Sequence, residues 1–132
     1  MSQIKSLTPK NAWTLLSSDS AAVLLDVRDR TEYAFVGHPK GAVNIPWKEA
    51  PDWKANSLFV DEVRQRIPSH DTPVLLLCRS GQRSLDAAKA LATAGYNNLT
   101  NVEEGFEGPL DPDKHRGTLG GWRFHGLPWE QS

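Results

Sequence analysis

The feature that most constrains this chain is an abrupt change of character after Leu77. The stretch Pro73-Val74-Leu75-Leu76-Leu77 is short and apolar, which is typical of a strand buried in a sheet. The run Cys78-Arg79-Ser80-Gly81-Gln82-Arg83 follows it and is polar. From Ser84 to Ala94 the chain has the alanine, leucine and lysine content of a helix, which should stop at Gly95. This order predicts a buried strand, a short loop and a helix, with Cys78 where the strand passes into the loop.

Cys78 is the one cysteine of the chain. In this place it would lie below the N–H groups of the loop and of the helix N-terminus, which attract anions and lower the pKa of a thiol. A free cysteine is also a common core residue, and three leucines precede this one. The two arginines that follow it favour the reactive interpretation. We therefore predict that Cys78 is a catalytic nucleophile.

Other apolar segments alternate with helical ones along the 132 residues, a length that suits one domain. The expected strands are 3–7, 22–28, 42–45, 74–77 and 98–102. The expected helices are 9–16, capped by Thr8, a single turn at 31–35, and the segments 61–67 and 84–94. The alternation predicts an α/β fold with a mostly parallel five-stranded sheet flanked by helices on both faces. In such sheets ligands bind beyond the carboxyl ends of the strands, where Cys78 is expected.

Four short motifs precede the cysteine loop in the chain: Asp26-Val27-Arg28, Glu32-Tyr33, Gly37-His38 and Gly41-Ala42-Val43-Asn44-Ile45-Pro46. Together with the loop they resemble the single-domain rhodanese-like (thiosulfate sulfurtransferase) family over roughly residues 7–108. The resemblance implies a sulfurtransferase that moves sulfane sulfur from thiosulfate or a similar donor to a thiol or cyanide, through a persulfide on Cys78. The expected partners are a small-molecule sulfur donor and a thiol acceptor, which could be a protein. No cofactor and no metal are implied.

The length of the loop separates two kinds of cysteine enzyme. Cysteine-dependent phosphatases place five residues between the cysteine and the arginine, whereas four separate Cys78 from Arg83. The shorter loop favours a sulfur atom over a phosphoryl group, whose oxygens need a wider ring of donors. The alternatives are an arsenate reductase or phosphatase on the same fold, and a non-catalytic domain that carries sulfur or binds a partner.

The expected substrate-binding residues follow the cysteine directly: Arg79, Ser80, Gly81, Gln82 and Arg83. An arginine that faced the pocket would attract an anion such as thiosulfate. The resemblance also implies that Arg83 could instead turn away and brace the loop, so which arginine faces the pocket stays open. Ser80 and Gln82 can donate hydrogen bonds to sulfur or to a sulfonate oxygen. Gly81 is expected to adopt a backbone conformation that bulkier residues avoid.

Three further residues are expected to support the site: Asp26, Arg28 and Ser84. Ser84 could equally be the N-cap of the helix. Arg28 and Glu32 stand four positions apart, which predicts an ion pair between them, with Asp26 accepting from nearby backbone N–H groups. We favour this structural role over acid–base catalysis. The histidines do not have the spacing of metal ligands.

Charge and composition restrict the partners and the location. The net charge is −1 and the basic residues are scattered, which argues against a nucleic-acid or membrane surface. A single cysteine fits a reducing compartment, and the first six residues lack the layout of a signal peptide. We therefore expect a cytoplasmic protein.

After Gly108 the sequence no longer alternates between strand and helix patterns. We expect residues 1–108 to form the rhodanese-like domain and residues 109–132 to be a C-terminal extension. The extension contains turn-forming proline and glycine, but also Trp122 and Trp129. Because tryptophan is a large apolar residue, we predict that the extension packs on the same domain.

Overall fold

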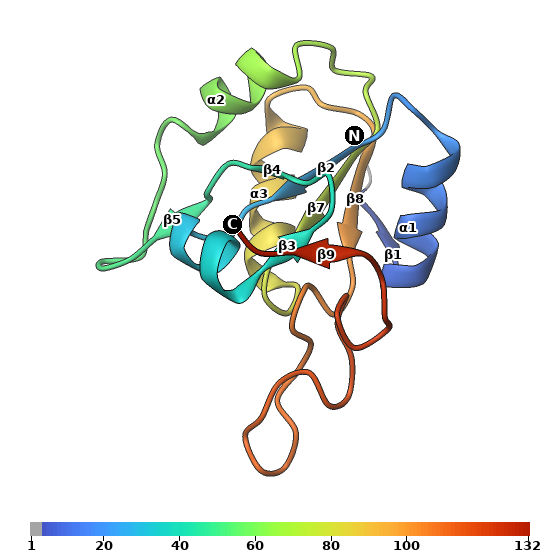
Figure 1. The fold of residues 1–132 in the computed structure, drawn as a ribbon. Helices are drawn as coiled ribbons and strands as arrows, with labels where there is room; N and C mark the ends of the chain where they lie inside the picture. The colour runs from blue at the N-terminus through green and yellow to red at the C-terminus, as the bar shows by residue number, and fades with distance from the viewer. Residues whose placement is uncertain (1–3) are drawn as a thin grey trace.

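The computed structural model describes residues 4–132 and has a five-stranded sheet at its centre (Figure 1). The strands stand in the order β1 (Ile4–Leu7), β8 (Leu99–Val102), β7 (Val74–Leu77), β2 (Val23–Asp26) and β4 (Val43–Asn44). All neighbouring strands of this sheet are parallel. The predicted α/β fold is therefore confirmed, and β7 has the predicted bounds. Gln3, the first residue of the first expected strand, lies outside the described residues.

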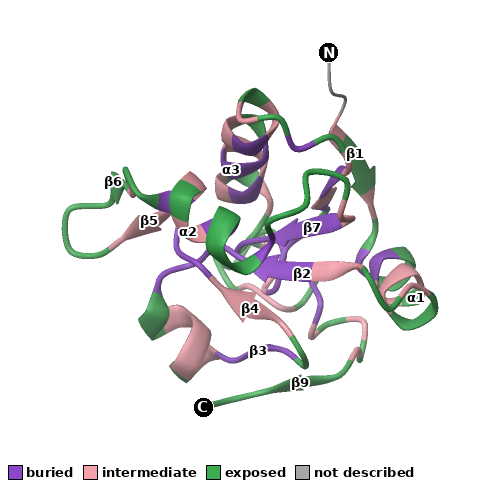
Figure 2. Ribbon diagram, turned by 90° about the horizontal axis from the view of Figure 1, so that it is seen from above, coloured by how far each residue is buried: buried purple, intermediate pink, exposed green. Residues whose placement is uncertain are grey.

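The alternation of side chains along β7 divides the core into two layers. Leu76 and Cys78 belong to a layer completed by α2 (Phe59–Arg66) and α3 (Gln82–Thr93). Leu75 and Leu77 belong to a layer completed by α1 (Pro9–Ser18) and by the C-terminal extension. Figure 2 shows the buried strands between these layers. Because both faces of the sheet are covered, every residue of β7 is buried, which explains the unbroken apolar run in the sequence.

The helices begin close to the expected positions. Thr8 caps α1, and its Oγ1 accepts the backbone N–H of Asn11 at 3.2 Å. α2 begins at Phe59, two residues before the expected start, and Phe59 is buried edge-on against Trp47. The turn expected at 31–35 is a π-helical turn, Glu32–Val36, which ends at Gly37. No helix within residues 4–132 has the length and apolar character needed to cross a membrane.

Two small antiparallel pairs were not expected from the sequence. β3 (His38–Pro39) pairs with β9 (Trp129–Glu130), and β5 (Lys48–Glu49) pairs with β6 (Lys54–Ala55). Each strand has two residues, too few to produce a hydrophobic period. The second pair forms a hairpin whose connecting turn carries Trp53.

Residues 109–132 return to the domain, where β9 pairs with β3 and other residues of the segment contact α1 and the π-helical turn (Figure 1). Trp122 is fully buried with its ring edge-on to Trp13 of α1, at 5.9 Å between centroids. Its Nε1 donates to the carbonyl of Pro128 at 2.8 Å. Further along, Gln131 donates its side-chain N–H to the carbonyl of Phe35 in the π-helical turn, at 2.6 Å. The extension thus connects α1 with the π-helical turn.

Candidate active site

Cys78 is the first residue after β7 and lies at the N-terminus of α3. Its side chain is buried, with 1% of the residue exposed. The backbone N–H of Gly81 donates to its Sγ at 3.0 Å. Gly81 is the N-cap of α3 and has a φ of +124°, in the region that favours glycine, as the sequence predicts. The sulfur therefore occupies the anion-binding position of a strand–loop–helix unit.

The carbonyl groups of the loop are held on its outer side by the turn that follows β8. The N–H of Phe106 donates to the carbonyl of Cys78 at 2.8 Å, and the N–H of Glu107 donates to that of Arg79 at 3.0 Å. In a trans peptide the N–H points opposite to the carbonyl, so the N–H groups of the next two residues are directed away from this turn. A Cβ on Gly105 would collide with the carbonyl of Cys78 and lie 2.5 Å from the carbonyl carbon of Arg79. This turn was not predicted to contact the cysteine loop, and its glycine was the one available signal.

Ser84 and Asn101 complete the polar surroundings of the sulfur. Ser84 Oγ lies 3.3 Å from Cys78 Sγ and 2.5 Å from Asn101 Oδ1. Ser84 is therefore a neighbour of the thiol, and the alternative role as N-cap is wrong because α3 begins at Gln82 with Gly81 as its cap. Asn101 was missed. Its position in β8, on the same face as Leu99, could have been found from the alternation of side chains.

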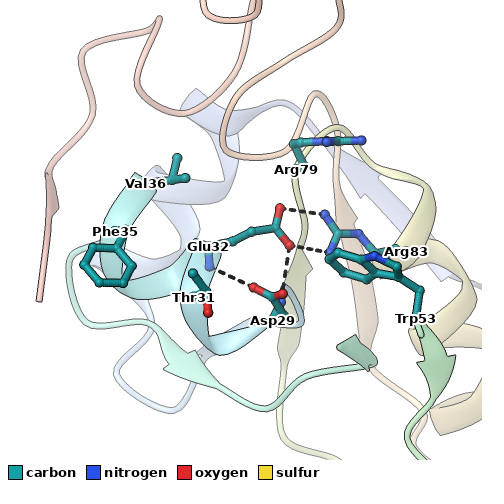
Figure 3. Close-up of a pocket in the computed structure, with 8 residues that line it drawn as sticks. All are labelled: Asp29, Thr31, Glu32, Phe35, Val36, Trp53, Arg79 and Arg83. Carbon is teal, nitrogen blue, oxygen red and sulfur yellow. Dashed lines mark hydrogen bonds and ion pairs between the residues drawn. The ribbon is translucent and has the colours of Figure 1, made fainter. Parts of the chain in front are cut away.

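Arg83 forms a bidentate ion pair with Glu32 of the π-helical turn (Figure 3). The distances are 2.7 Å from Nη1 to Oε1 and 2.9 Å from Nη2 to Oε2. The N–H of Glu32 also donates to Asp29 Oδ1 at 2.8 Å. The predicted Arg28–Glu32 pair is wrong: the loop's arginine, 51 residues away in sequence, takes its place. Arg83 thus braces the loop, one of the two roles left open.

The ion pair shifts the titration of both partners. Burial raises the pKa of Glu32, but the hydrogen bonds and charge of Arg83 outweigh burial, so the pKa lies below the ordinary value. Burial lowers the pKa of Arg83, and the hydrogen bond and charge of Glu32, with a smaller effect of Cys78, raise it above the ordinary value. Both shifts favour the charged pair.

Arg28 pairs instead with Asp26, in the interior of the molecule. Both side chains are fully buried, and Arg28 Nη2 lies 2.6 Å from Asp26 Oδ2. Asp26 Oδ1 also accepts the backbone N–H of Arg28 at 3.1 Å, as predicted for its capping role. Arg28 further donates to the carbonyl of Gly37 at 2.6 Å and stacks on Phe106, 4.5 Å from the ring centroid. The pair connects the end of β2 with the π-helical turn and with the turn after β8.

A pocket of about 510 Å³ opens beside the cysteine loop (Figure 3). The π-helical turn, the β5–β6 hairpin and the cysteine loop all contribute to it. Its lining residues are Asp29, Thr31, Glu32, Phe35, Val36, Trp53, Arg79 and Arg83. Cys78 itself lies beneath the loop and does not line the pocket.

The other loop residues differ in how free their side chains are. Arg79 is exposed at the rim of the pocket and has no hydrogen-bond or ion-pair partner among residues 4–132. Ser80 is exposed as well. Gln82 donates to Asp86 of its own helix at 3.1 Å. Within residues 4–132, the charge of Arg79 is therefore available to bind a ligand, whereas the charge of Arg83 is paired with that of Glu32.

The family model, the solved structures and the sequence relatives that match this chain agree with one another. The family model of the rhodanese-like domain matches residues 8–109. The crystal structure of Rv0390 from M. tuberculosis has a TM-score of 0.89 and 44% identity, and the match covers 99% of this chain and all of that one. The uncharacterized protein RC0915 of Rickettsia conorii is 33% identical over 96% of this chain and 98% of its own length. The thiosulfate sulfurtransferase GlpE of Haemophilus influenzae is 30% identical over 79% of this chain and 86% of its own.

Proposed function

This chain belongs to the rhodanese-like domain family, and we propose that it is a sulfurtransferase that carries sulfur as a persulfide on Cys78. The observation that carries the proposal is the contact of Cys78 Sγ with the N–H of Gly81 at the start of α3. The relationship to GlpE, which is named a thiosulfate sulfurtransferase, supports the same chemistry.

In the first half of the reaction, the Cys78 thiolate attacks the outer sulfur of thiosulfate or a similar donor. A new S–S bond forms at Cys78, and the S–S bond of thiosulfate breaks with its electron pair, so that sulfite leaves. The product is a persulfide anion on Cys78. Backbone donors of the loop and the dipole of α3 stabilise negative charge at this place before and after the transfer.

The loop residues divide the binding of the donor among them. Arg79 attracts the anionic donor, because its charge has no partner within residues 4–132. Ser80 and Gln82 supply side-chain donors to the sulfonate oxygens. Arg83 holds the loop in shape through Glu32 and contributes positive potential at the sulfur.

In the second half, an acceptor thiolate attacks the outer sulfur of the persulfide and leaves with it, so that the Cys78 thiolate is regenerated. Cyanide would take the same sulfur and leave as thiocyanate. The pocket is larger than thiosulfate requires, and its Phe35 and Trp53 side chains offer apolar surface to the body of a thiol, either a small molecule or a protein.

The length of the loop favours sulfur transfer over phosphoryl transfer. Phosphoryl transfer needs donors placed at three equatorial oxygens. The ring of six residues from Cys78 to Arg83 closes with the sulfur already in contact with Gly81. Negligible hydrolysis of aryl phosphates is therefore expected.

The test is the intact mass of the protein after incubation with thiosulfate. Wild-type protein should gain the mass of one sulfur atom, and cyanide should remove it with formation of thiocyanate. The Cys78→Ser variant should unfold at a similar temperature and gain nothing. If the mass of the wild type stays unchanged with several sulfur donors, the sulfurtransferase proposal is wrong. Efficient phosphatase activity that depends on Cys78 would replace it.

A further inference from the structure

Asn101 lies beside the reactive sulfur, and the proposed reaction assigns it no role. Its Nδ2 donates to the carbonyl of Gly81 at 3.2 Å, and its Oδ1 lies 2.5 Å from Ser84 Oγ. Both of these neighbours also contact Cys78 Sγ: the N–H of Gly81 at 3.0 Å and the hydroxyl of Ser84 at 3.3 Å. The Asn101 side chain on β8 therefore forms hydrogen bonds with both Gly81 and Ser84, the two residues that contact the sulfur through the N–H and the hydroxyl.

The hydrogen-bond network fixes the direction of the Ser84 hydroxyl. The carbonyl of Gly81 can only accept, so the NH₂ group of Asn101 must face it and the amide oxygen must face Ser84. Two oxygens 2.5 Å apart need a proton between them, and the amide oxygen has none. Ser84 Oγ also lies 3.1 Å from the carbonyl oxygen of Gly81, but its much shorter contact is the one with Asn101, so Ser84 supplies its single proton to Asn101. Its lone pairs are then the part of the hydroxyl that is left to face Cys78 Sγ.

We propose that Asn101 is a positioning residue that sets the acidity of Cys78 by keeping Ser84 an acceptor. The neutral thiol donates its S–H to Ser84 Oγ, while the thiolate has the N–H of Gly81 as a donor and gains none from Ser84. Ionisation releases the proton to solvent and gives up the contact with Ser84. A Ser84 that was free to rotate would donate to the thiolate instead, so Asn101 favours the protonated form.

The effect of Asn101 on the acidity of Cys78 is separate from that of the charged groups around the sulfur. Arg83 lies on α3 and is paired with Glu32 of the π-helical turn, and Arg79 belongs to the loop itself. The Asp26–Arg28 pair lies at the end of the neighbouring strand β2. Substitutions at Asn101 and Ser84 change none of these charges, apart from the aspartate variant described below.

The test is a pH titration of the thiolate by its ultraviolet absorbance, with the Cys78→Ser protein as the blank. Burial raises the pKa of Tyr33 and of Tyr96, so both phenols ionise above the ordinary range of tyrosine. Asn101→Ala should lower the midpoint by about one pH unit, which corresponds to one hydrogen bond to a charged group. A midpoint that is unchanged or higher overturns the proposal.

A double-variant cycle separates this role from general loosening of the loop. In a Ser84→Ala background, Asn101→Ala should move the midpoint by less than about a quarter of its effect in the wild type, because the hydroxyl that transmits the effect is gone. An equal shift in both backgrounds would assign Asn101 a purely structural role and overturn the proposal.

The Asn101→Asp variant covers the case in which the alanine variant does not fold. It retains an acceptor for Ser84, loses the donor to the carbonyl of Gly81 and adds negative charge, so its midpoint should lie at or above that of the wild type. A midpoint below the wild type would contradict the proposal. The titration uses no sulfur donor, so its result does not depend on whether the protein transfers sulfur.

Discussion

Glu32 and Arg83 meet through two hydrogen bonds of 2.7 and 2.9 Å and join the π-helical turn to the first turn of α3. Both side chains are less than one-fifth exposed. The guanidinium also lies 5.5 Å from the centroid of the Trp53 ring, which supports it from the β5–β6 hairpin. Three separate segments of the chain therefore meet at Arg83, the last residue of the cysteine loop, and the shape of the loop depends on all three.

The first prediction concerns the Glu32→Gln variant. At pH 7 it should unfold with a free energy about 1–3 kcal/mol lower than the wild type, because a partly buried, charge-assisted pair is lost. Since the pKa of Glu32 is lowered by folding, its contribution is complete above the ordinary value of 4.5 and is lost as the pH falls through the folded value. Urea unfolding between pH 7 and pH 3 should show the two proteins converging at the acid end.

The matched control is Glu49→Gln. Glu49 pairs with Arg30 at 3.6 Å on the surface, so its loss should change stability by less than about 0.5 kcal/mol at pH 7. A difference between Glu32→Gln and wild type that does not vary with pH would contradict the assignment.

The second prediction concerns Gly105→Ala. The added Cβ would collide with the backbone of Cys78 and Arg79, so the loop must shift and sulfur transfer should fall at least about tenfold, together with stability. Gly126→Ala is the matched control: it has a similar φ of +73° against +62°, but open space around its Cβ. Thiocyanate formation and thermal unfolding of the two variants would separate the collision from backbone strain. Equal losses in both would show that the turn does not hold the loop.

The third prediction separates the two arginines of the loop. Arg79→Ala should raise the KM for thiosulfate several-fold while leaving the unfolding temperature close to that of the wild type, because its charge is exposed and unpaired among the described residues. Arg83→Ala should lower the unfolding temperature as well, since it leaves Glu32 without its partner. Steady-state kinetics at two salt concentrations would test this, with Arg66→Ala, an exposed arginine on α2, as the control. A normal KM for Arg79→Ala would remove Arg79 from the binding site.

The fourth prediction concerns the C-terminal extension. Trp122→Ala should lower the free energy of unfolding by about 3–5 kcal/mol, because the ring is fully buried against Trp13. Phe124→Ala, in the same extension but 47% exposed, should cost less than about 1 kcal/mol. Truncation after Gly108 should lower stability at least as much as Trp122→Ala. Unchanged urea unfolding after truncation would show that the extension adds nothing to the fold.

The strand and helix order could be predicted because each main element repeats its pattern over several residues. β7 was found from its apolar run, and α1 from the threonine and proline at its start. The two-residue strands β3, β5, β6 and β9 were missed because their pairing depends on distant partners and leaves no local pattern.

The residues of the cysteine loop could be predicted from the sequence, whereas most contacts made to the loop by other segments could not. The strand–loop–helix order predicted the place of Cys78 directly after β7 and the positive φ of Gly81. The pairing of Arg28 was mistaken because helical spacing was applied to a segment that is not an α-helix, where Asp26 and Glu32 point to different partners. Asn101 and the turn at Gly105 reach the loop through the tertiary fold, so their roles appear only when β8 is placed beside β7.

The parallel register of β7 and β8 places Leu76 opposite Asn101. Because Asn101 must keep this register, the position of β8 in the chain restricts where residues can be inserted or deleted. A one-residue insertion or deletion early in β8 would turn each later side chain to the other face of the sheet, and Asn101 would leave the α3 side. Residues 112–115, by contrast, are all exposed and belong to a surface loop, and insertions are tolerated at such places. Natural variation in chain length among similar proteins should therefore gather at 112–115 and spare the interval from β8 to Gly108.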